Sequence, residues 1–189
     1  MQAGSKEFLF KLLTTPSPTG FEERIQRLVA KHMRSYADLI EGDLHGNLIV
    51  ALNPKAERKI MLAGHCDQIG FMVKHISDDG SIWVAALGGI DPGVLYGAAV
   101  TIHTKNGPVH GVIGRKPIHI QKADERKKLE IELERIWIDV GARNKKEAEK
   151  LIEVGDAVTF ESGVKELLNG RIVSPGMDDR VGLFVAMET

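Results

Sequence analysis

The chain has 189 residues, of which 43% are hydrophobic, so it is long enough to bury the core of one ordinary domain or of two small ones. Its 25 Lys and Arg residues nearly balance its 26 Asp and Glu residues, which leaves no net field to attract nucleic acid or an anionic membrane. No apolar run approaches the roughly 20 residues that span a bilayer, the start MQAGSKEFLFKLL does not resemble a signal peptide, and Cys66 is the single cysteine, so a cytoplasmic location without disulfides is expected.

A breaker-rich loop followed by a helix is predicted near the N-terminus. Thr19 and Glu22 have the spacing of a capping box, in which the first residue caps the helix and the second bonds back to it. Apolar residues then recur at helical spacing and predict a stripe that faces the core. The members of this stripe are Phe21, Ile25, Leu28, Val29 and Met33.

Two short strands are predicted next. Asp43, Gly46 and Asn47 supply turn chemistry before a strand over residues 48–52. Residues 59–64 form a second apolar run, and a short run of this kind favours a strand buried on both faces inside an α/β sheet.

A β-rich module begins near residue 70, with the runs FMVKHI, IWVAAL, AAVTIHT and VHGVIG. Asn106-Gly107 between two of these runs is a strong hairpin signal. Residues 129–140 fit either a helix or a strand with a bulge near Glu134-Arg135, and their β-branched and aromatic content favours a strand over residues 131–140. The charged residues 119–128 are predicted to be a mobile, solvated loop.

The last third of the chain alternates short elements. Asn144 and Glu147 predict the start of a helix that runs to Glu153 and ends at Gly155. AVTFES and RIVSP are predicted as short strands, and an apolar helix begins within GMDDRVGLFVAMET.

His65 and Asp67 directly follow the second predicted strand, and residues two apart in a strand point the same way. An imidazole held by a carboxylate is a frequent metal-binding pair, because one ring nitrogen binds the ion while the other donates to the acid. The pair also fits a histidine that is only satisfied by a neighbouring aspartate at a strand end. Cys66 is expected to point to the opposite face as a small buried hydrophobe.

Asp178 and Asp179 follow a Pro-Gly break at the start of the last predicted helix. Carboxylates at such a position can cap the helix and complement its dipole. An oxygen ligand that bridges two cations would need the same position, so both roles stay open. Surface or cross-strand roles are expected for His75, His103 and His110, which lie in predicted strands.

Seven segments, in chain order, resemble the cytosolic metallo-aminopeptidases that form tetrahedral dodecamers. These segments are SPTGFEE, DLHGN, AGHCDQIGFMVKHI, LGGIDPG, IDVGA, GDAVTF and SPGMDDRVG. The resemblance implies an α/β fold, part of a phosphorylase/hydrolase-like dinuclear-zinc peptidase domain that is interrupted by a PDZ-like β-barrel dimerisation domain. Residues 1–69 and 161–189 would belong to the peptidase domain, and residues 70–160 would form the insert.

The resemblance also implies an activity, the removal of N-terminal residues from short peptides with two divalent ions, zinc or cobalt, about 3.5–4 Å apart. By motif, His65 would bind one ion, Asp67 would act in catalysis by orienting His65, and Asp178 would bridge both ions. Two ions lower the pKa of a shared water, polarise the scissile carbonyl and hold the substrate amine. The insert would hold copies of the chain together as dimers, and the dimers would assemble into a dodecamer.

The chain departs from the family in length. Members of the family are longer and supply a catalytic Glu, an adjacent Glu ligand, another acidic ligand and a final His downstream of the DDR segment. A truncated form, or a portion, of an aminopeptidase with incompletely bound metal is therefore predicted. The alternatives are a catalytically inactive, oligomerising or binding fragment, and an endoglucanase, a label that some family members carry, although no suitable pair of carboxylates stands out for sugar hydrolysis.

Overall fold

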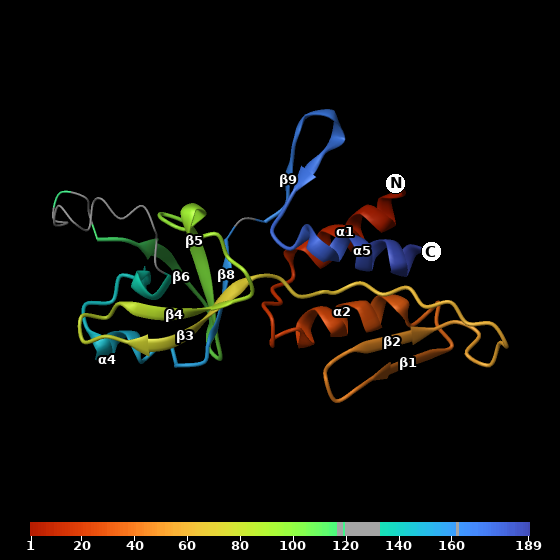
Figure 1. Cartoon of the computed structure of the whole chain (residues 1–189), viewed down its shortest axis with the longest axis horizontal. Helices are drawn as coiled ribbons and strands as arrows, with labels where there is room; N and C mark the ends of the chain where they lie inside the picture. The colour runs from red at the N-terminus through yellow and green to blue at the C-terminus, as the bar shows by residue number, and fades with distance from the viewer. Residues whose placement is uncertain (117–118, 120–132, 162) are drawn as a thin grey trace. The chain divides into compact units, whose positions relative to one another are not determined.

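The computed structural model describes residues 1–116, 119, 133–161 and 163–189 (Figure 1). It divides into two compact units, each with its own hydrophobic core. Unit 1 comprises Met1–Gln68 and Ser162–Thr189, and unit 2 comprises Ile69–Glu161. The mixture of helices and sheets confirms the predicted α/β class.

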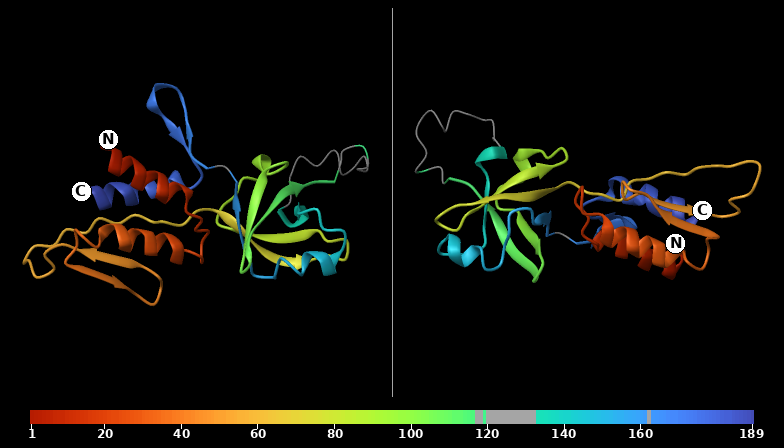
Figure 2. Two further views of the ribbon diagram at one scale, coloured as in Figure 1. Left: turned by 180° about the vertical axis from the view of Figure 1, so that it is seen from behind. Right: turned by 90° about the horizontal axis from the view of Figure 1, so that it is seen from below.

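The helices of unit 1 are α1 (Ala3–Thr14), α2 (Glu23–Met33) and α5 (Met177–Glu188). The terminal helices α1 and α5 lie side by side, although they come from opposite ends of the chain, and α2 also contacts α1 (Figures 1 and 2). Their apolar faces share one core, because each helix has an apolar stripe to bury. The buried members of this core are Phe8, Leu12, Ile25, Val29, Cys66 and Leu183.

The start of α2 differs from the prediction. Thr19 does not cap the helix: its hydroxyl donates to Asp67, and the Glu22 carboxylate accepts the N–H of Gly20 at 2.7 Å. The predicted capping box is therefore wrong. Phe21 is also wrongly placed in the core, since it precedes the helix and is 38% exposed, whereas Ile25 and the later members of the stripe are buried or half-buried.

Unit 1 also contains two antiparallel strand pairs, β1 (Leu39–Gly42) with β2 (Leu48–Ala51) and β9 (Lys165–Glu166) with β10 (Ile172–Val173). A 3₁₀ turn, η4 (Leu168–Gly170), connects β9 to β10. The predicted strands at residues 48–52 and within RIVSP are confirmed, each slightly shorter than predicted.

The predicted strand at residues 59–64 is wrong. Within the described residues this extended segment has no strand partner and belongs to neither sheet of unit 1. Ile60 and Met61 are 91% and 87% exposed. The apolar pattern is that of a strand with neighbours on both sides, but a strand needs backbone partners to form, and the described part of the chain does not supply them.

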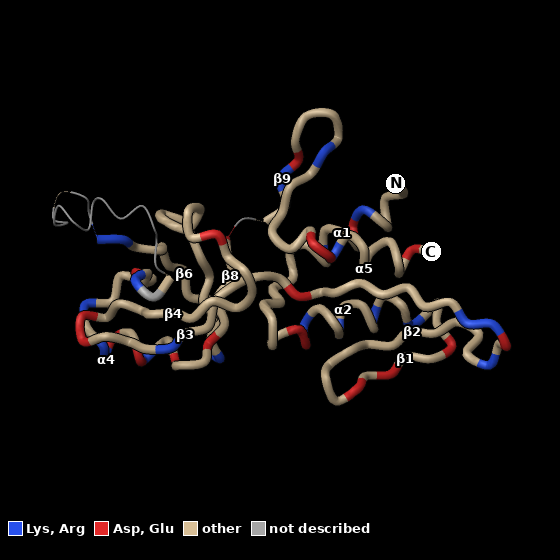
Figure 3. The backbone as a smooth tube through the Cα atoms, in the orientation of Figure 1, with Lys and Arg blue, Asp and Glu red and all other residues tan. Residues whose placement is uncertain are grey.

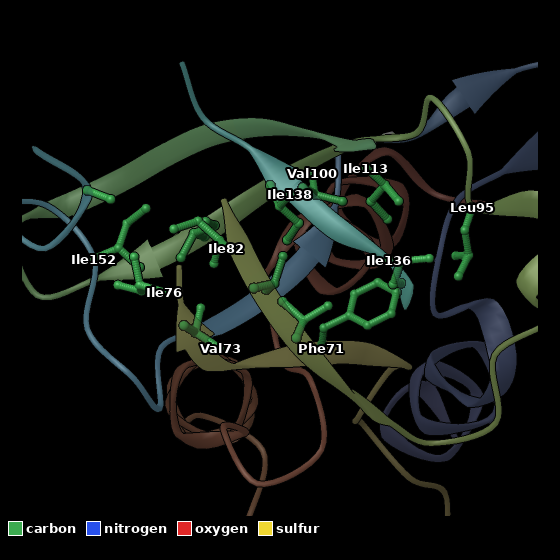
Figure 4. Packing of buried hydrophobic residues seen from close by; sticks show 14 of the residues in the cluster. Phe71, Val73, Ile76, Ile82, Leu95, Val100, Ile113, Ile136, Ile138 and Ile152 are labelled. Carbon is green, nitrogen blue, oxygen red and sulfur yellow. The ribbon is translucent and has the colours of Figure 1, made fainter. Parts of the chain in front are cut away.

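Unit 2 is a closed antiparallel barrel with the strand order β3-β4-β7-β6-β5-β8. Its strands are β3 (Gly70–Ile76), β4 (Ile82–Leu87), β5 (Ala99–Thr104), β6 (Gly107–Gly114), β7 (Trp137–Asp139) and β8 (Ala157–Phe160). Closure gives each strand a partner on both sides, which protects strand edges. Apolar side chains such as Phe71, Val100 and Ile138 fill the interior (Figure 4).

Local turn chemistry in the barrel follows the sequence. The Asn106-Gly107 hairpin is confirmed: Gly107 has a φ of 120°, and Thr104 at the end of β5 pairs with Gly107 at the start of β6. The short helix α4 (Lys145–Ala148) begins as predicted, because Asn144 accepts the N–H of Glu147. It ends earlier than predicted, since the N–H of Leu151 bonds to the carbonyl of Ala148 in a tighter turn.

The segment before α4 is only partly a strand. Trp137–Asp139 form β7, and Leu133–Arg135 form a 3₁₀ turn, η3, in place of the predicted bulge. The N–H of Ile136 bonds to the carbonyl of Leu133, a spacing typical of a 3₁₀ turn. Residues 131–132, and the predicted loop at 119–128 apart from His119, lie outside the described residues. Another 3₁₀ turn, η1, covers Pro92–Val94.

Charge is distributed without a dominant sign. Lys and Arg residues and Asp and Glu residues both occur in each unit (Figure 3). No helix in the described part of the chain is both long and apolar enough to cross a bilayer.

Candidate metal centre

Three segments of unit 1 meet at the candidate site: the connection between α1 and α2, residues 65–68, and the start of α5. The N–H of Gln68 donates to the carbonyl of Ser17 at 2.9 Å, and the N–H of Thr19 donates to the carbonyl of Gln68 at 3.3 Å. Pro18 and Gln68 form a parallel β-bridge between these two bonds. The bridge places Thr19 beside Asp67.

The structure brings together the three residues that the sequence analysis assigned to the site. Nδ1 of His65 lies 2.7 Å from Oδ1 of Asp67, and Nε2 of His65 lies 3.2 Å from Oδ1 of Asp178. An ionised carboxylate only accepts hydrogen bonds, so the proton of the first contact is on Nδ1. The other oxygen of Asp67 accepts the hydroxyl of Thr19 at 2.6 Å.

The two adjacent aspartates of α5 have different surroundings. Asp178 and Asp179 have non-helical backbone angles, and Oδ1 of Asp179 accepts the N–H of Gly182 at 3.0 Å, at the start of the regular part of α5. The side chain of Asp178 is 97% exposed and has an oxygen next to His65. Asp179 therefore has the capping role that the sequence left open. Asp178 instead places a carboxylate oxygen, a possible metal ligand, beside the imidazole.

Cys66 lies on the opposite side of the segment, as predicted. It is 8% exposed and packs in the core of unit 1. Burial, together with the charges of Glu22 and Asp67, raises the pKa of its thiol to about 11. The thiol therefore stays protonated at neutral pH and is a poor metal ligand.

Arg180 is a fully buried cation that joins the three segments, and the sequence analysis did not single it out. Its guanidinium donates to the carbonyl of Cys66 at 3.2 Å, to the carbonyl of Leu13 at 3.1 Å and to the hydroxyl of Ser17 at 2.6 Å. The Ser17 hydroxyl in turn donates to the carbonyl of Cys66 at 2.8 Å. Burial lowers the pKa of Arg180 to about 10. A cation directly before the apolar run VGLFVAM was the available sequence signal.

The carboxylates around His65 change its protonation. Partial burial alone lowers the pKa of His65, but hydrogen bonds and charges from Asp67, and then from Asp178, raise it overall. Burial raises the pKa of Asp67, but the hydrogen bonds from Thr19 and His65 lower it overall. Asp67 is therefore ionised at neutral pH and favours a proton on Nδ1.

The pair His65 and Asp178 fits part of a metal coordination shell. With one proton on Nδ1, a neutral imidazole directs the lone pair of Nε2 toward a carboxylate oxygen 3.2 Å away. Only a second proton or a cation between the two atoms makes that contact favourable. Two ligands of one tetrahedral zinc ion, each about 2.1 Å from the metal, lie about 3.4 Å apart. Within the described residues, however, no group of three or more His, Cys, Asp or Glu side chains could hold a metal ion.

Comparison with known proteins identifies the family. The profile of the M42 glutamyl aminopeptidase family matches residues 46–189. The chain belongs to this family. The lysyl aminopeptidase of Pyrococcus furiosus is 32% identical over 184 residues, which are 96% of this chain and 53% of that protein.

Solved structures of TET aminopeptidases share the fold. A TET aminopeptidase from a marine sediment thaumarchaeon matches with a TM-score of 0.94 and 37% identity, over 98% of this chain and 52% of that one. The TET1 peptidase of Pyrococcus horikoshii, which can assemble into a tetrahedron or a large octahedral shell, matches with a TM-score of 0.85 and 36% identity, over 97% of this chain and 55% of that one. The chain thus spans about half the length of these similar proteins.

Proposed function

We propose that this chain supplies part of a dinuclear-metal aminopeptidase that removes N-terminal residues from short peptides. The observation that carries the proposal is the position of His65, whose ring nitrogens face Asp67 and Asp178 at 2.7 and 3.2 Å in a chain of the M42 family. Metal-binding histidines typically have a carboxylate hydrogen-bonded to one ring nitrogen and another ligand oxygen near the other ring nitrogen.

In this proposal His65 and Asp178 would hold divalent ions, zinc or cobalt, with Asp178 as the ligand that two ions would share. The bound ions would acidify a water and polarise the peptide carbonyl. Asp67 keeps the proton at Nδ1 of His65 and so leaves Nε2 as a donor of electrons. The described residues provide these two ligands and one supporting carboxylate, so the remaining ligands and the general base would come from other residues.

We also propose that the barrel of unit 2 is the self-association domain, inserted at residues 70–160 between the peptidase portions 1–69 and 161–189. The assembly of the TET1 peptidase of Pyrococcus horikoshii into closed shells supports a homo-oligomer. A catalytically inactive, self-associating fragment is the second candidate, and the partial ligand set favours it. Oligomers in sedimentation velocity, with less than one tightly bound metal ion per chain, would support the inactive fragment.

Cobalt binding to the purified 189-residue chain tests the site directly, because cobalt bound to protein ligands has visible absorption bands. We expect bands with the wild-type chain, and their loss in His65→Ala and Asp178→Asn. His110→Ala is the matched control, because His110 also lies beside a carboxylate, that of Glu161 at 3.0 Å, in the barrel. Bands that persist in His65→Ala but vanish in His110→Ala would reject the proposed centre.

Peptidase activity is tested with aminoacyl-p-nitroanilides in the presence of zinc or cobalt. The 189-residue chain is compared with the same chain completed by the downstream half of the Pyrococcus furiosus relative, and folding of both is checked by circular dichroism. We expect hydrolysis only from the completed chain, and loss of hydrolysis with His65→Ala. If the completed chain is folded and binds metal but does not hydrolyse the p-nitroanilides, the proposed activity is rejected.

A further inference from the structure

We propose that Thr19 is a positioning residue of the metal centre. Its hydroxyl fixes the carboxylate of Asp67, so that this carboxylate holds the proton on Nδ1 of His65 and leaves Nε2 free to bind a cation. The inference deepens the proposed function and rests on it, but its first test needs no metal.

Thr19 and His65 are connected through the carboxylate of Asp67. The Thr19 hydroxyl donates to Oδ2 of Asp67 at 2.6 Å, and Nδ1 of His65 donates to Oδ1 at 2.7 Å. Each oxygen of Asp67 therefore has its own donor, and hydrogen bonds to an ionised carboxylate are short and strong. Rotation of the carboxylate about its last torsion, which is otherwise soft, would break both bonds.

The hydroxyl is held in place by the backbone around it. The N–H of Thr19 bonds to the carbonyl of Gln68, one residue beyond Asp67, and the N–H of Phe21 bonds to the carbonyl of Pro18 at 2.8 Å. Ser17, on the other side, is bonded to the buried guanidinium of Arg180. Although the Thr19 side chain is exposed, its backbone is fixed on both sides, so little entropy is lost when its hydroxyl binds Asp67.

The Thr19 hydroxyl does not cap the following helix. A threonine just before a helix ordinarily accepts a backbone N–H of the first turn, but α2 begins at Glu23 and Glu22 bonds to Gly20 instead. The hydroxyl of Thr19 acts as a donor to a carboxylate 48 residues away in the sequence. Its function is therefore to be sought at Asp67 and His65.

The imidazole nitrogen signals of His65 test the proposal in the metal-free chain. Proteins labelled with ¹⁵N-histidine are compared at about pH 9, where imidazoles are neutral, and the His65 signals are assigned by their loss in His65→Asn. We expect a dominant Nδ1–H form in the wild type, a shift toward the Nε2–H form in Thr19→Val, which has the same shape without the hydroxyl, and recovery in Thr19→Ser.

Thr15→Val is the control, since it removes another threonine hydroxyl, one that bonds to the carbonyl of Lys11 at 2.7 Å. It should leave the His65 signals unchanged. The positioning role would be overturned if His65 kept the wild-type tautomer in Thr19→Val, or if Thr19→Ser did not restore that tautomer.

Cobalt titration of the same variants links the tautomer to the centre. We expect Thr19→Val to weaken cobalt binding about tenfold, as is common when the partner that orients a metal-binding group is lost, and Thr19→Ser to bind as the wild type does. Equal binding by wild type and Thr19→Val would overturn the inference and leave the proposed centre intact. Absence of cobalt binding in the wild type would instead overturn the centre itself, while the nitrogen signals still decide whether Thr19 orients the pair.

Discussion

Nε2 of His65 and Oδ1 of Asp178 lie 3.2 Å apart, although 113 residues separate them in the sequence. Unit 1 brings them together through a buried network rather than through direct strand pairing. Arg180, two residues after Asp178, donates to the carbonyl of Cys66, the residue after His65. The start of α5 and the His65 segment are therefore fastened to each other just behind the site, and the geometry of the site depends on that connection.

Arg180→Met should destabilise unit 1 by about 2–4 kcal/mol, because it leaves two buried carbonyls and a buried hydroxyl without their charged donor. Urea unfolding followed by circular dichroism measures the change. Arg27→Met is the control: Arg27 is exposed and pairs with Glu23 one turn away, so its loss should cost less than about 0.5 kcal/mol. Equal stability of the two variants would show that the network does not hold the segments together.

Ile25→Ala and Ile60→Ala should differ sharply, although both remove the same atoms from unit 1. Ile25 is fully buried in the core, so its truncation should cost about 2–4 kcal/mol, whereas Ile60 is 91% exposed and its truncation should cost less than about 0.5 kcal/mol. Urea midpoints of the two variants measure this. A large loss in Ile60→Ala would mean that residues 59–64 are buried in solution, as the sequence alone predicts.

The features predicted correctly are those that neighbouring residues decide. The turn at Asp43, the Asn106-Gly107 hairpin and the Asn144 cap each close hydrogen bonds within a few residues. His65 and Asp67 also lie close in sequence, so their pairing followed from spacing alone.

The errors have the opposite cause, since distant partners decide those features. Thr19 matches a capping box in sequence, but a carboxylate 48 residues away competes for its hydroxyl. Residues 59–64 match a buried strand, but whether they form one depends on neighbouring strands that their own pattern cannot supply. Arg180 was overlooked because its partners are backbone carbonyls and a serine from other segments, which no motif displays.

Cys66 should be inert and should not bind the metal. Burial raises the pKa of its thiol to about 11, so at neutral pH the folded chain should react with a disulfide reagent far more slowly than the urea-unfolded chain. Absorbance of the released thiolate measures both rates. Cobalt bound to the chain should show no intense sulfur charge-transfer band, and Cys66→Ala should retain the visible cobalt spectrum. A sulfur band that disappears in Cys66→Ala would add the thiol to the ligand set.

Asp43 should make the β1–β2 hairpin sensitive to acid. Hydrogen bonds from the side chain and the N–H of Asn47 hold the pKa of Asp43 below its ordinary value. A carboxyl group whose pKa is lower in the folded chain than in the unfolded chain stabilises the fold above the unfolded pKa, and this contribution is lost as the pH falls through the folded value.

The carboxyl carbon shift of Asp43, followed by NMR during an acid titration, should therefore give a midpoint below that of an ordinary aspartate. Asn47→Ala removes the side-chain donor and should move the midpoint upward, whereas Asn53→Ala, which alters a turn residue just after β2, should not. A midpoint for Asp43 that Asn47→Ala leaves unchanged would mean that the amide of Asn47 does not hold this turn closed, and the acid sensitivity of the hairpin would then have to arise from the backbone donors at His45 and Asn47 alone.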